Sequence, residues 1–144
     1  LRFPATRIAG EGDAVTVWIP PDEDELSAEQ LDDVLALLHR ELPGSLDDLV
    51  ELFDRFGAVH PHDEPHYFLT LFATRPESRG RGLGMALLRD DLERIDAVGI
   101  PSYLESSNPG NDKRYASLGY VPVGQFEHPS NGAVVTTMWR AVGG

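Results

Sequence analysis

The sequence has 144 residues, of which 24 are acidic and 12 are basic, so its net charge is -12 at pH 7, and it contains no cysteine. This length is enough for one hydrophobic core, and we predict a single domain over residues 1–144. The composition excludes disulfide bonds, thiolate metal sites and cysteine nucleophiles, and the scarcity of lysine and arginine argues against a nucleic-acid partner.

The charge is unevenly distributed along the chain. Residues 1–74 contain 16 of the acidic and four of the basic residues, so this half carries the whole net charge, while residues 75–144 are neutral. We interpret most of these carboxylates as a solvated surface, and their field as one that favours a cationic ligand. No stretch reaches the roughly 18 apolar residues of a membrane-spanning helix, so we expect a cytoplasmic protein without a membrane partner.

The first predicted elements are a strand and two helices. Alternation and β-branching over residues 14–19 predict a strand that ends at Pro20–Pro21. After an acidic turn, Ser27 and Gln30 form a capping-box pattern ahead of a helix. Ser45 predicts the start of a second helix by the same device.

The centre of the chain is predicted to be a long apolar strand followed by an amphipathic helix. Residues 66–74 are long and apolar enough for a strand in the middle of a sheet, and they follow an irregular loop at residues 57–65. The helix begins after a glycine-rich stretch and ends at Gly99. The remaining predicted elements are a strand, a short helix and two late strands, at residues 101–106, 111–118, 120–126 and 134–139. This order predicts an α/β fold with an antiparallel end to its sheet.

The segment Arg79-Gly80-Arg81-Gly82-Leu83-Gly84 lies between the central strand and this helix. Its glycines permit a tight turn, and the first N–H groups of a helix have no partner within the helix, so the segment predicts a pyrophosphate site. A dinucleotide-binding fingerprint is excluded, because it requires Gly or Ala where this chain has Met85 or Leu87. A P-loop is excluded because the segment contains no lysine.

This segment and four others resemble the GNAT family of N-acetyltransferases. Arg79, Gly82 and Gly84 match the family's signature Arg/Gln-x-x-Gly-x-Gly/Ala. The other similar segments, in the family's order and spacing, are residues 17–21, 66–76, 104–111 and 115–120. The pattern is similar to the branch that contains puromycin N-acetyltransferase. The resemblance implies the GNAT fold, an α/β fold with a mixed central sheet, splayed parallel strands and flanking helices.

The resemblance also implies that acetyl-CoA donates an acetyl group to an amine, without a metal. Coenzyme A would lie between the splayed strands, with its pantetheine along the first strand and its pyrophosphate on the glycine-rich turn. The implied contacts are Phe72, Ala73, Thr74, Arg79, Gly80, Arg81, Gly82, Leu83, Gly84, Met85 and Asn111. A backbone N–H of Ala73 or Thr74 would face the developing oxyanion. Tyr115 matches the family's tyrosine that protonates the leaving thiolate, and its alternative role is that of a hydrogen-bonded core tyrosine.

The resemblance does not identify the general base. Some family members carry a glutamate on the central strand, where this chain has Phe68. Glu105, on the second of the parallel strands, is our first candidate, and His66 is the second. A structural carboxylate and a solvated histidine are the alternative interpretations of these two residues. A water chain to solvent would serve equally well as the base.

The acceptor side is also left open. Family members usually begin with a strand and two helices that form part of the acceptor wall, whereas thirteen residues precede the strand at Ala14 here. Either the chain is a fragment, or a partner chain such as a second copy completes this wall. We expect a small-molecule amine as the acceptor. A coenzyme-binding module without catalysis, and an interaction domain that only keeps the fold, are the alternatives.

Overall fold

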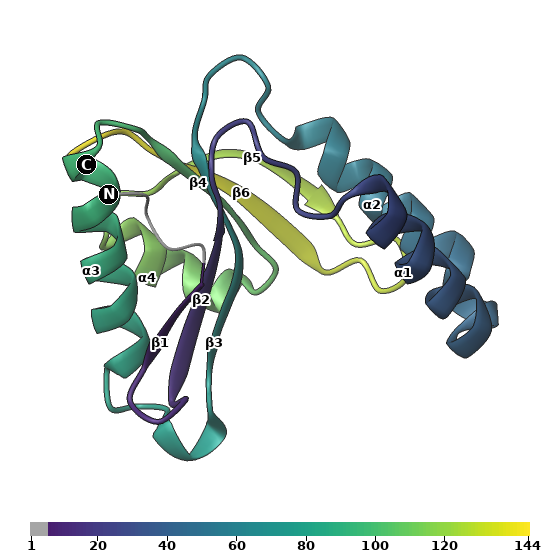
Figure 1. Ribbon diagram of the computed structural model, residues 1–144, viewed down its shortest axis with the longest axis horizontal. Helices are drawn as coiled ribbons and strands as arrows, with labels where there is room; N and C mark the ends of the chain where they lie inside the picture. Colours follow the sequence, from purple (N-terminus) through teal and green to yellow (C-terminus); the bar gives the residue numbers. More distant parts are fainter. Residues whose placement is uncertain (1–5) are drawn as a thin grey trace.

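The computed structural model describes residues 6–144, which form a six-stranded mixed sheet with helices beside it (Figure 1). The sheet order is β1-β2-β3-β4-β6-β5, with β3 and β4 parallel and all other neighbours antiparallel. The strands are β1 Thr6–Ala9, β2 Ala14–Ile19, β3 Tyr67–Thr74, β4 Ser102–Ser106, β5 Val121–Glu127 and β6 Val134–Arg140. The α-helices are α1 Ala28–Glu41, α2 Leu46–Val59, α3 Leu83–Ala97 and α4 Asp112–Ala116. The predicted α/β fold with a mixed sheet is confirmed.

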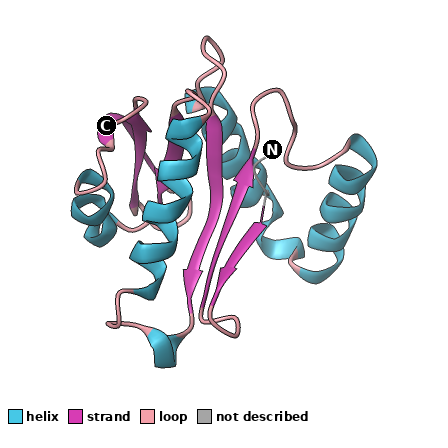
Figure 2. Ribbon diagram, turned by 60° about the vertical axis from the view of Figure 1, so that its left-hand side comes forward, coloured by secondary structure: helices cyan, strands magenta, loops and turns pink. Residues whose placement is uncertain are grey.

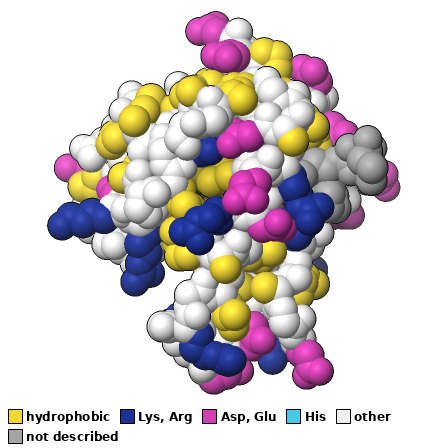
Figure 3. Space-filling view, turned by 90° about the vertical axis from the view of Figure 1, so that its left-hand side faces the viewer, with side chains coloured by type: hydrophobic (Ala, Val, Ile, Leu, Met, Phe, Trp, Pro, Cys, Tyr) yellow, Lys and Arg dark blue, Asp and Glu magenta, His cyan; other side chains and the backbone are white. Residues whose placement is uncertain are grey.

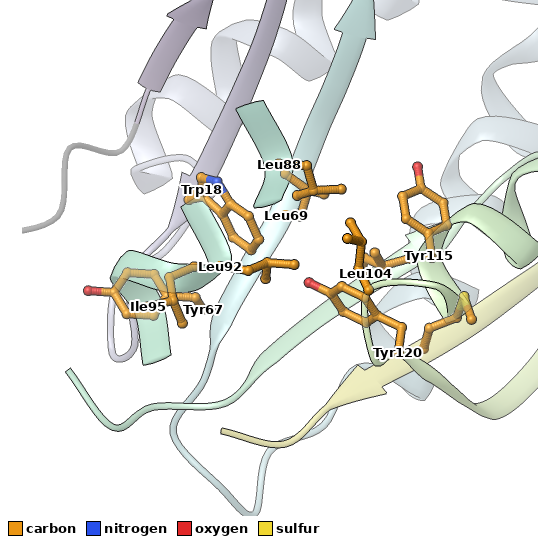
Figure 4. Close-up of a cluster of buried hydrophobic side chains, with 11 residues drawn as sticks. Trp18, Tyr67, Leu69, Leu88, Leu92, Ile95, Leu104, Tyr115 and Tyr120 are labelled. Atoms are coloured by element: carbon orange, nitrogen blue, oxygen red, sulfur yellow. The ribbon is translucent and has the colours of Figure 1, made fainter. Parts of the chain in front are cut away.

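β3 lies inside the sheet and buries side chains on both of its faces. On one face, Tyr67 and Leu69 enter the main hydrophobic cluster with Leu88 and Ile95 of α3 (Figure 4). On the other face, Phe68 packs among aromatic rings. Full burial of such a side chain stabilises a fold by about 2 kcal/mol, so a strand that is apolar on both faces is most stable between two other strands.

A buried carboxylate fastens α3 to the sheet. Asp91 of α3 is fully buried and accepts hydrogen bonds from Trp18 Nε1 at 2.9 Å, from the Thr16 hydroxyl and from Arg7. A buried charge requires such partners, because leaving it unpaired costs several kcal/mol. Arg7 lies on β1, a four-residue strand that the sequence pattern did not predict.

The helices α1 and α2 lie apart from α3, on the other side of strands β1–β3 (Figures 1 and 2). The predicted capping box of α1 is confirmed, because Gln30 N donates to Ser27 Oγ and Ser27 N donates to Gln30 Oε1. Ser45 makes no side-chain capping bond within the described chain, so the prediction that it repeats this device was wrong. Asp48 lies three residues after Ser45, at the position where a capping box needs Glu or Gln. α2 also continues to Val59, into the stretch predicted as an irregular loop.

The α1–α2 pair contacts the sheet at β5. The Phe56 ring packs edge-on against Phe126, with 5.1 Å between the ring centroids, and Arg55 donates a hydrogen bond to the carbonyl of Glu127. Neither helix contains a fully buried residue. In residues 6–144, the helices are all too short or too polar to cross a membrane.

The parallel strands β3 and β4 part within the sheet. They pair only along Tyr67–Leu69 of β3, although this strand is longer. At the point of separation Thr70 has no counterpart on β2, where the register shifts between Val17 and Trp18. Such an extra residue is a β-bulge, which bends its strand and increases the local twist. The implied splay is therefore present, and the β4-facing edge of residues 70–74 has no strand partner in the described chain.

Candidate active site

A cleft of about 650 Å³ opens where β3 leaves β4, and we call it the splay cleft. The predicted residues that line it are Phe72, Ala73, Thr74, Arg79, Gly80, Gly82, Leu83, Gly84, Met85, Asn111 and Tyr115. Arg81 is exposed and lies outside this lining. Ser78, Asn108 and Arg114 line the cleft as well, and sequence reasoning missed them. The fold thus brings residues 72–74, 78–85 and 108–115 together around one cleft. From the sequence, only the family resemblance placed these segments at the same site.

The start of α3 forms one wall of the splay cleft. Gly82 is the N-cap of α3 with φ of +78°, and Gly80 has φ of +76°, so both adopt the left-handed conformation that favours glycine. Within the described residues, no side chain caps this helix. A Cβ at either glycine would meet no atom within 4 Å, so the turn is open to a ligand. An uncapped helix N-terminus that lines an open cleft is suited to bind an anion.

Gly84 has a different role from the two glycines before it. A Cβ there would lie 2.5 Å from Thr74 Oγ1 and 3.1 Å from the Phe72 ring. The first turn of α3 therefore packs directly on the end of β3, and any side chain would push the two elements apart. This close approach holds the start of α3 against β3 in the lining of the splay cleft.

Two arginines give the splay cleft positive charge. Arg79 donates a hydrogen bond from Nε to the Thr74 carbonyl at 3.2 Å, which ties the turn before α3 to the end of β3. Arg114 of α4 donates to Asn111 Oδ1, also at 3.2 Å, from the opposite wall. Both arginine side chains are consistent with binding of phosphate groups.

Tyr115 is held at the wall of the splay cleft by the packing of α4. Asp112, at the start of α4, accepts hydrogen bonds from Ser106 Oγ at 2.6 Å and from Thr136 Oγ1 at 2.9 Å. The Tyr115 ring centroid lies 6.4 Å from that of Phe72, and its hydroxyl points away from the hydrophobic cluster (Figure 4). Burial and the negative charge of Asp112 raise the pKa of Tyr115. The phenol is therefore protonated at neutral pH and able to donate a proton.

A second hollow of about 390 Å³ lies beside Phe68, and we call it the acidic hollow. Its lining residues are Ile19, Pro20, Pro21, Asp22, Glu23, Asp24, Glu25, His60, Pro61, His62, Glu64, Pro65, His66 and Phe68. This described lining has five carboxylates and no lysine or arginine, whereas the α3 side of the molecule shows both kinds of charge (Figure 3). The hollow reaches the splay, because Thr70 at the bulge donates a hydrogen bond to Glu25.

Two histidines connect the acidic hollow to Glu105. His66 Nδ1 lies 2.8 Å from the Glu64 carbonyl oxygen, and His66 Nε2 lies 3.2 Å from His60 Nε2. His60 Nδ1 is 3.8 Å from Glu105 Oε1, which also accepts a hydrogen bond from Tyr103 at 3.1 Å. Burial lowers the pKa of His66, whereas burial and the charge of Glu105 raise the pKa of Tyr103.

The two catalytic candidates from the sequence lie in different places. Tyr115 lines the splay cleft, whereas Glu105 contacts His60 of the acidic hollow and itself lines neither cavity. His60, which sequence reasoning missed, joins Glu105 to His66. Its only sequence signal is the density of histidines between residues 60 and 66. Within the described residues, no group of three or more histidines and carboxylates is placed to hold a metal ion.

Comparison with known proteins connects these features to an enzyme family. The model of the acetyltransferase (GNAT) family matches residues 49–120. The chain is similar to a Corynebacterium glutamicum structure described as histone acetyltransferase HPA2 and related acetyltransferase, with 25% identity and a TM-score of 0.65, over 94% of this chain and 60% of that one. This chain therefore spans 60% of that protein's length.

Two further structures share the fold at lower identity. Arylalkylamine N-acetyltransferase 2 from Aedes aegypti is 12% identical with a TM-score of 0.64, over 94% of this chain and 71% of that one. Polyamine N-acetyltransferase from Drosophila melanogaster is 18% identical with a TM-score of 0.55, over 92% of this chain and 72% of that one. These two likenesses concern the fold.

Proposed function

Because the chain belongs to the GNAT acetyltransferase family, we propose that it transfers the acetyl group of acetyl-CoA to an amine of a small, positively charged molecule. The observation that carries this proposal is the pair of cavities at the splay of β3 and β4. One has an anion-binding helix start and a protonated tyrosine, and the other is lined by carboxylates. The resemblance of residues 17–21 supports a place in the branch of puromycin N-acetyltransferase.

The splay cleft suits acetyl-CoA in three respects. The free edge of residues 72–74 offers backbone hydrogen bonds to the amides of pantetheine. The N-terminus of α3, with Arg79 and Arg114, offers N–H groups and positive charge to the phosphates. The open space at Gly80 and Gly82 leaves room for them.

The reaction then needs two proton transfers. The amine nitrogen attacks the thioester carbon, the C–S bond breaks, the nitrogen loses a proton as the amide forms, and the coenzyme leaves as a thiol once its sulfur gains a proton. Two observations support Tyr115 as the proton donor to the sulfur: its raised pKa keeps it protonated, and it lines the splay cleft. In the described chain its hydroxyl has no hydrogen-bond partner, which disfavours the alternative of a hydrogen-bonded core tyrosine.

The acidic hollow supports a cationic acceptor. Five carboxylates line it without a compensating lysine or arginine, so its potential attracts an ammonium group and repels an anion. Phe68 and the prolines give it an apolar floor that suits a short alkyl chain. Its contact with the bulge, through Glu25, brings a bound amine to the side of the sheet opposite the pyrophosphate site.

A matched pair of variants tests the coenzyme site. Gly82→Asp and Gly82→Asn differ only in charge, both residue types tolerate positive φ better than most, and both cap helices well. We expect calorimetry to show acetyl-CoA binding by the parent and by the Asn variant. The Asp carboxylate should weaken it by on the order of tenfold or more, through repulsion of the pyrophosphate.

Equal affinities in the two variants would place the phosphates elsewhere. No binding by a folded parent would remove the proposed function. Binding without transfer to any amine would leave a coenzyme-binding module. Released coenzyme is measured with a thiol reagent, and the absence of cysteine in this chain removes the protein background.

A further inference from the structure

On the α1–α2 side of the sheet, a chain of close contacts joins three titratable side chains, His66, His60 and Glu105, and the Glu64 backbone carbonyl holds its His66 end. These residues come from the loop before β3, from the approach to β3 and from β4, so the fold brings them together over 45 positions of sequence. Two of its members, His60 and His66, line the acidic hollow. Glu105 is the first residue of β4 beyond its pairing with β3.

The contacts determine where the protons lie on the two rings. The Glu64 carbonyl can only accept, so Nδ1 of His66 must carry a hydrogen. Burial lowers the pKa of His66, so the ring is neutral and its Nε2 is an acceptor. His60 Nε2, at 3.2 Å, must then be the donor.

This assignment leaves Nδ1 of His60 without a proton when the ring is neutral. That lone pair faces Oε1 of Glu105 at 3.8 Å, so two acceptors meet across a short gap. One added proton converts this repulsion into an ion pair. Tyr103, which donates to the same carboxylate oxygen, holds the acceptor in place.

We propose that His60 and Glu105 together accept the proton of the substrate ammonium group, with His66 as the positioning residue that fixes the His60 ring. This inference rests on the proposed function. The ammonium N–H bond breaks, the proton is held between His60 Nδ1 and Glu105 Oε1, and the pair changes from a charge of -1 to zero. The freed nitrogen lone pair attacks the thioester carbon, the C–S bond breaks, and the nitrogen loses a second proton to solvent as the amide forms.

The surroundings of His60 place one carboxylate against its ring. Besides Glu105, the titratable groups that face His60 are His62 and His66, with ring centroids at 5.8 and 5.0 Å, and Tyr103 at 5.0 Å. Phe68 closes the remaining side with its ring centroid at 5.0 Å. Glu105 is thus the carboxylate in direct reach of His60, and its side chain is only 10% exposed, so water screens the pair weakly.

Imidazole nitrogen NMR of the unliganded protein tests the pair without any substrate. We expect the neutral protein to show hydrogen on Nδ1 of His66 and on Nε2 of His60. In Glu105→Gln, the side-chain amide can donate a hydrogen bond to the lone pair of His60 Nδ1, so the chemical shift of this nitrogen should change. An unchanged His60 Nδ1 signal in this variant overturns the pairing.

Steady-state kinetics with acetyl-CoA and 1,4-diaminobutane test the catalytic role. His60→Gln should lower kcat/KM at pH 7 by about 100-fold, and the loss should shrink as pH rises, because free amine then forms without a base. His128→Gln, in the turn after β5, is the control and should behave as the parent. A His60→Gln profile parallel to that of the parent overturns this inference alone. Failure of the parent to bind acetyl-CoA instead overturns the proposed function.

Discussion

Asp112 helps to hold Tyr115 in position, and its charge adds to burial in raising the pKa of that phenol. Its carboxylate holds the start of α4 through Ser106 and Thr136. A tyrosine that protonates a thiolate must be protonated before the reaction and must touch the cleft, and Asp112 contributes to both conditions.

Tyr115→Phe should therefore lower kcat by about 100-fold while leaving the Kd of acetyl-CoA unchanged, because the ring still packs and only the proton is lost. Tyr120→Phe is the matched control. Its hydroxyl bonds to Ser102 in the core at 2.8 Å, outside the splay cleft, so its loss should cost about 1 kcal/mol of stability and little activity. Stopped assays of thiol release and calorimetry measure the two quantities. A Tyr115→Phe enzyme with parental kcat would contradict the role of acid.

The residues of the proposed site differ in how far the sequence could predict them. Gly82 and Gly84 follow from a local motif, and Tyr115 from the resemblance of residues 115–120 to the GNAT family. His60 could not be predicted, because its contact with Glu105 depends on how the loop before β3 folds back over β4. The motif also does not distinguish the roles of the two glycines, because only the structure shows open space at Gly82 and close packing at Gly84.

Among the elements, α3 contributes to the core, to the splay cleft and to the attachment of the sheet. One face packs in the core, its first turn lines the splay cleft, and Asp91 ties it to β1 and β2. A helix that must hold an anion site against a strand needs such a fixed attachment, because a shift of α3 would change the width of the cleft.

Asp91→Ala should lower the free energy of unfolding by about 3 kcal/mol, because Arg7 and the Trp18 indole would lose their buried acceptor. Glu93→Ala, at an exposed position of the same helix, should change it by less than about 0.5 kcal/mol. Urea titration followed by tryptophan fluorescence gives both values. Equal effects of the two substitutions would show that the carboxylate does not anchor α3.

The predictability of the elements follows their length and their local signals. β3 and α3 are long and strongly patterned, and the capping box at Ser27 is a local hydrogen-bond pattern, so these were predicted. β1 has only four residues and is stable only through its pairing with β2. The bulge at Thr70 depends on the mismatch between two strands, and no single segment encodes it.

Across the whole molecule, each of the two cavities carries the charge opposite to that of its proposed substrate. The first half of the chain, with its net charge of -12, supplies all of the lining residues of the acidic hollow, while the neutral second half supplies the helix N-terminus and arginines of the splay cleft. An anionic coenzyme and a cationic amine would therefore approach through fields of matching sign. The two fields meet at the splay of β3 and β4.

A diamine should accordingly be a better acceptor than a monoamine of the same length. We expect kcat/KM for 1,4-diaminobutane to exceed that for butylamine, and the ratio to fall as salt is raised, because ions screen the carboxylates. The double variant Asp22→Asn, Asp24→Asn removes two charges from the acidic hollow, and asparagine tolerates the φ of +64° at position 22. It should raise the KM of the diamine several-fold.

The same variant should raise the KM of butylamine less than that of the diamine, because butylamine carries one ammonium group instead of two, and it should leave the Kd of acetyl-CoA nearly unchanged. Equal kcat/KM values for the two amines in the parent would show that the acidic hollow does not select the acceptor. The field of the first half would then act on solubility alone, and the amine would have to reach the splay by a path that avoids these carboxylates.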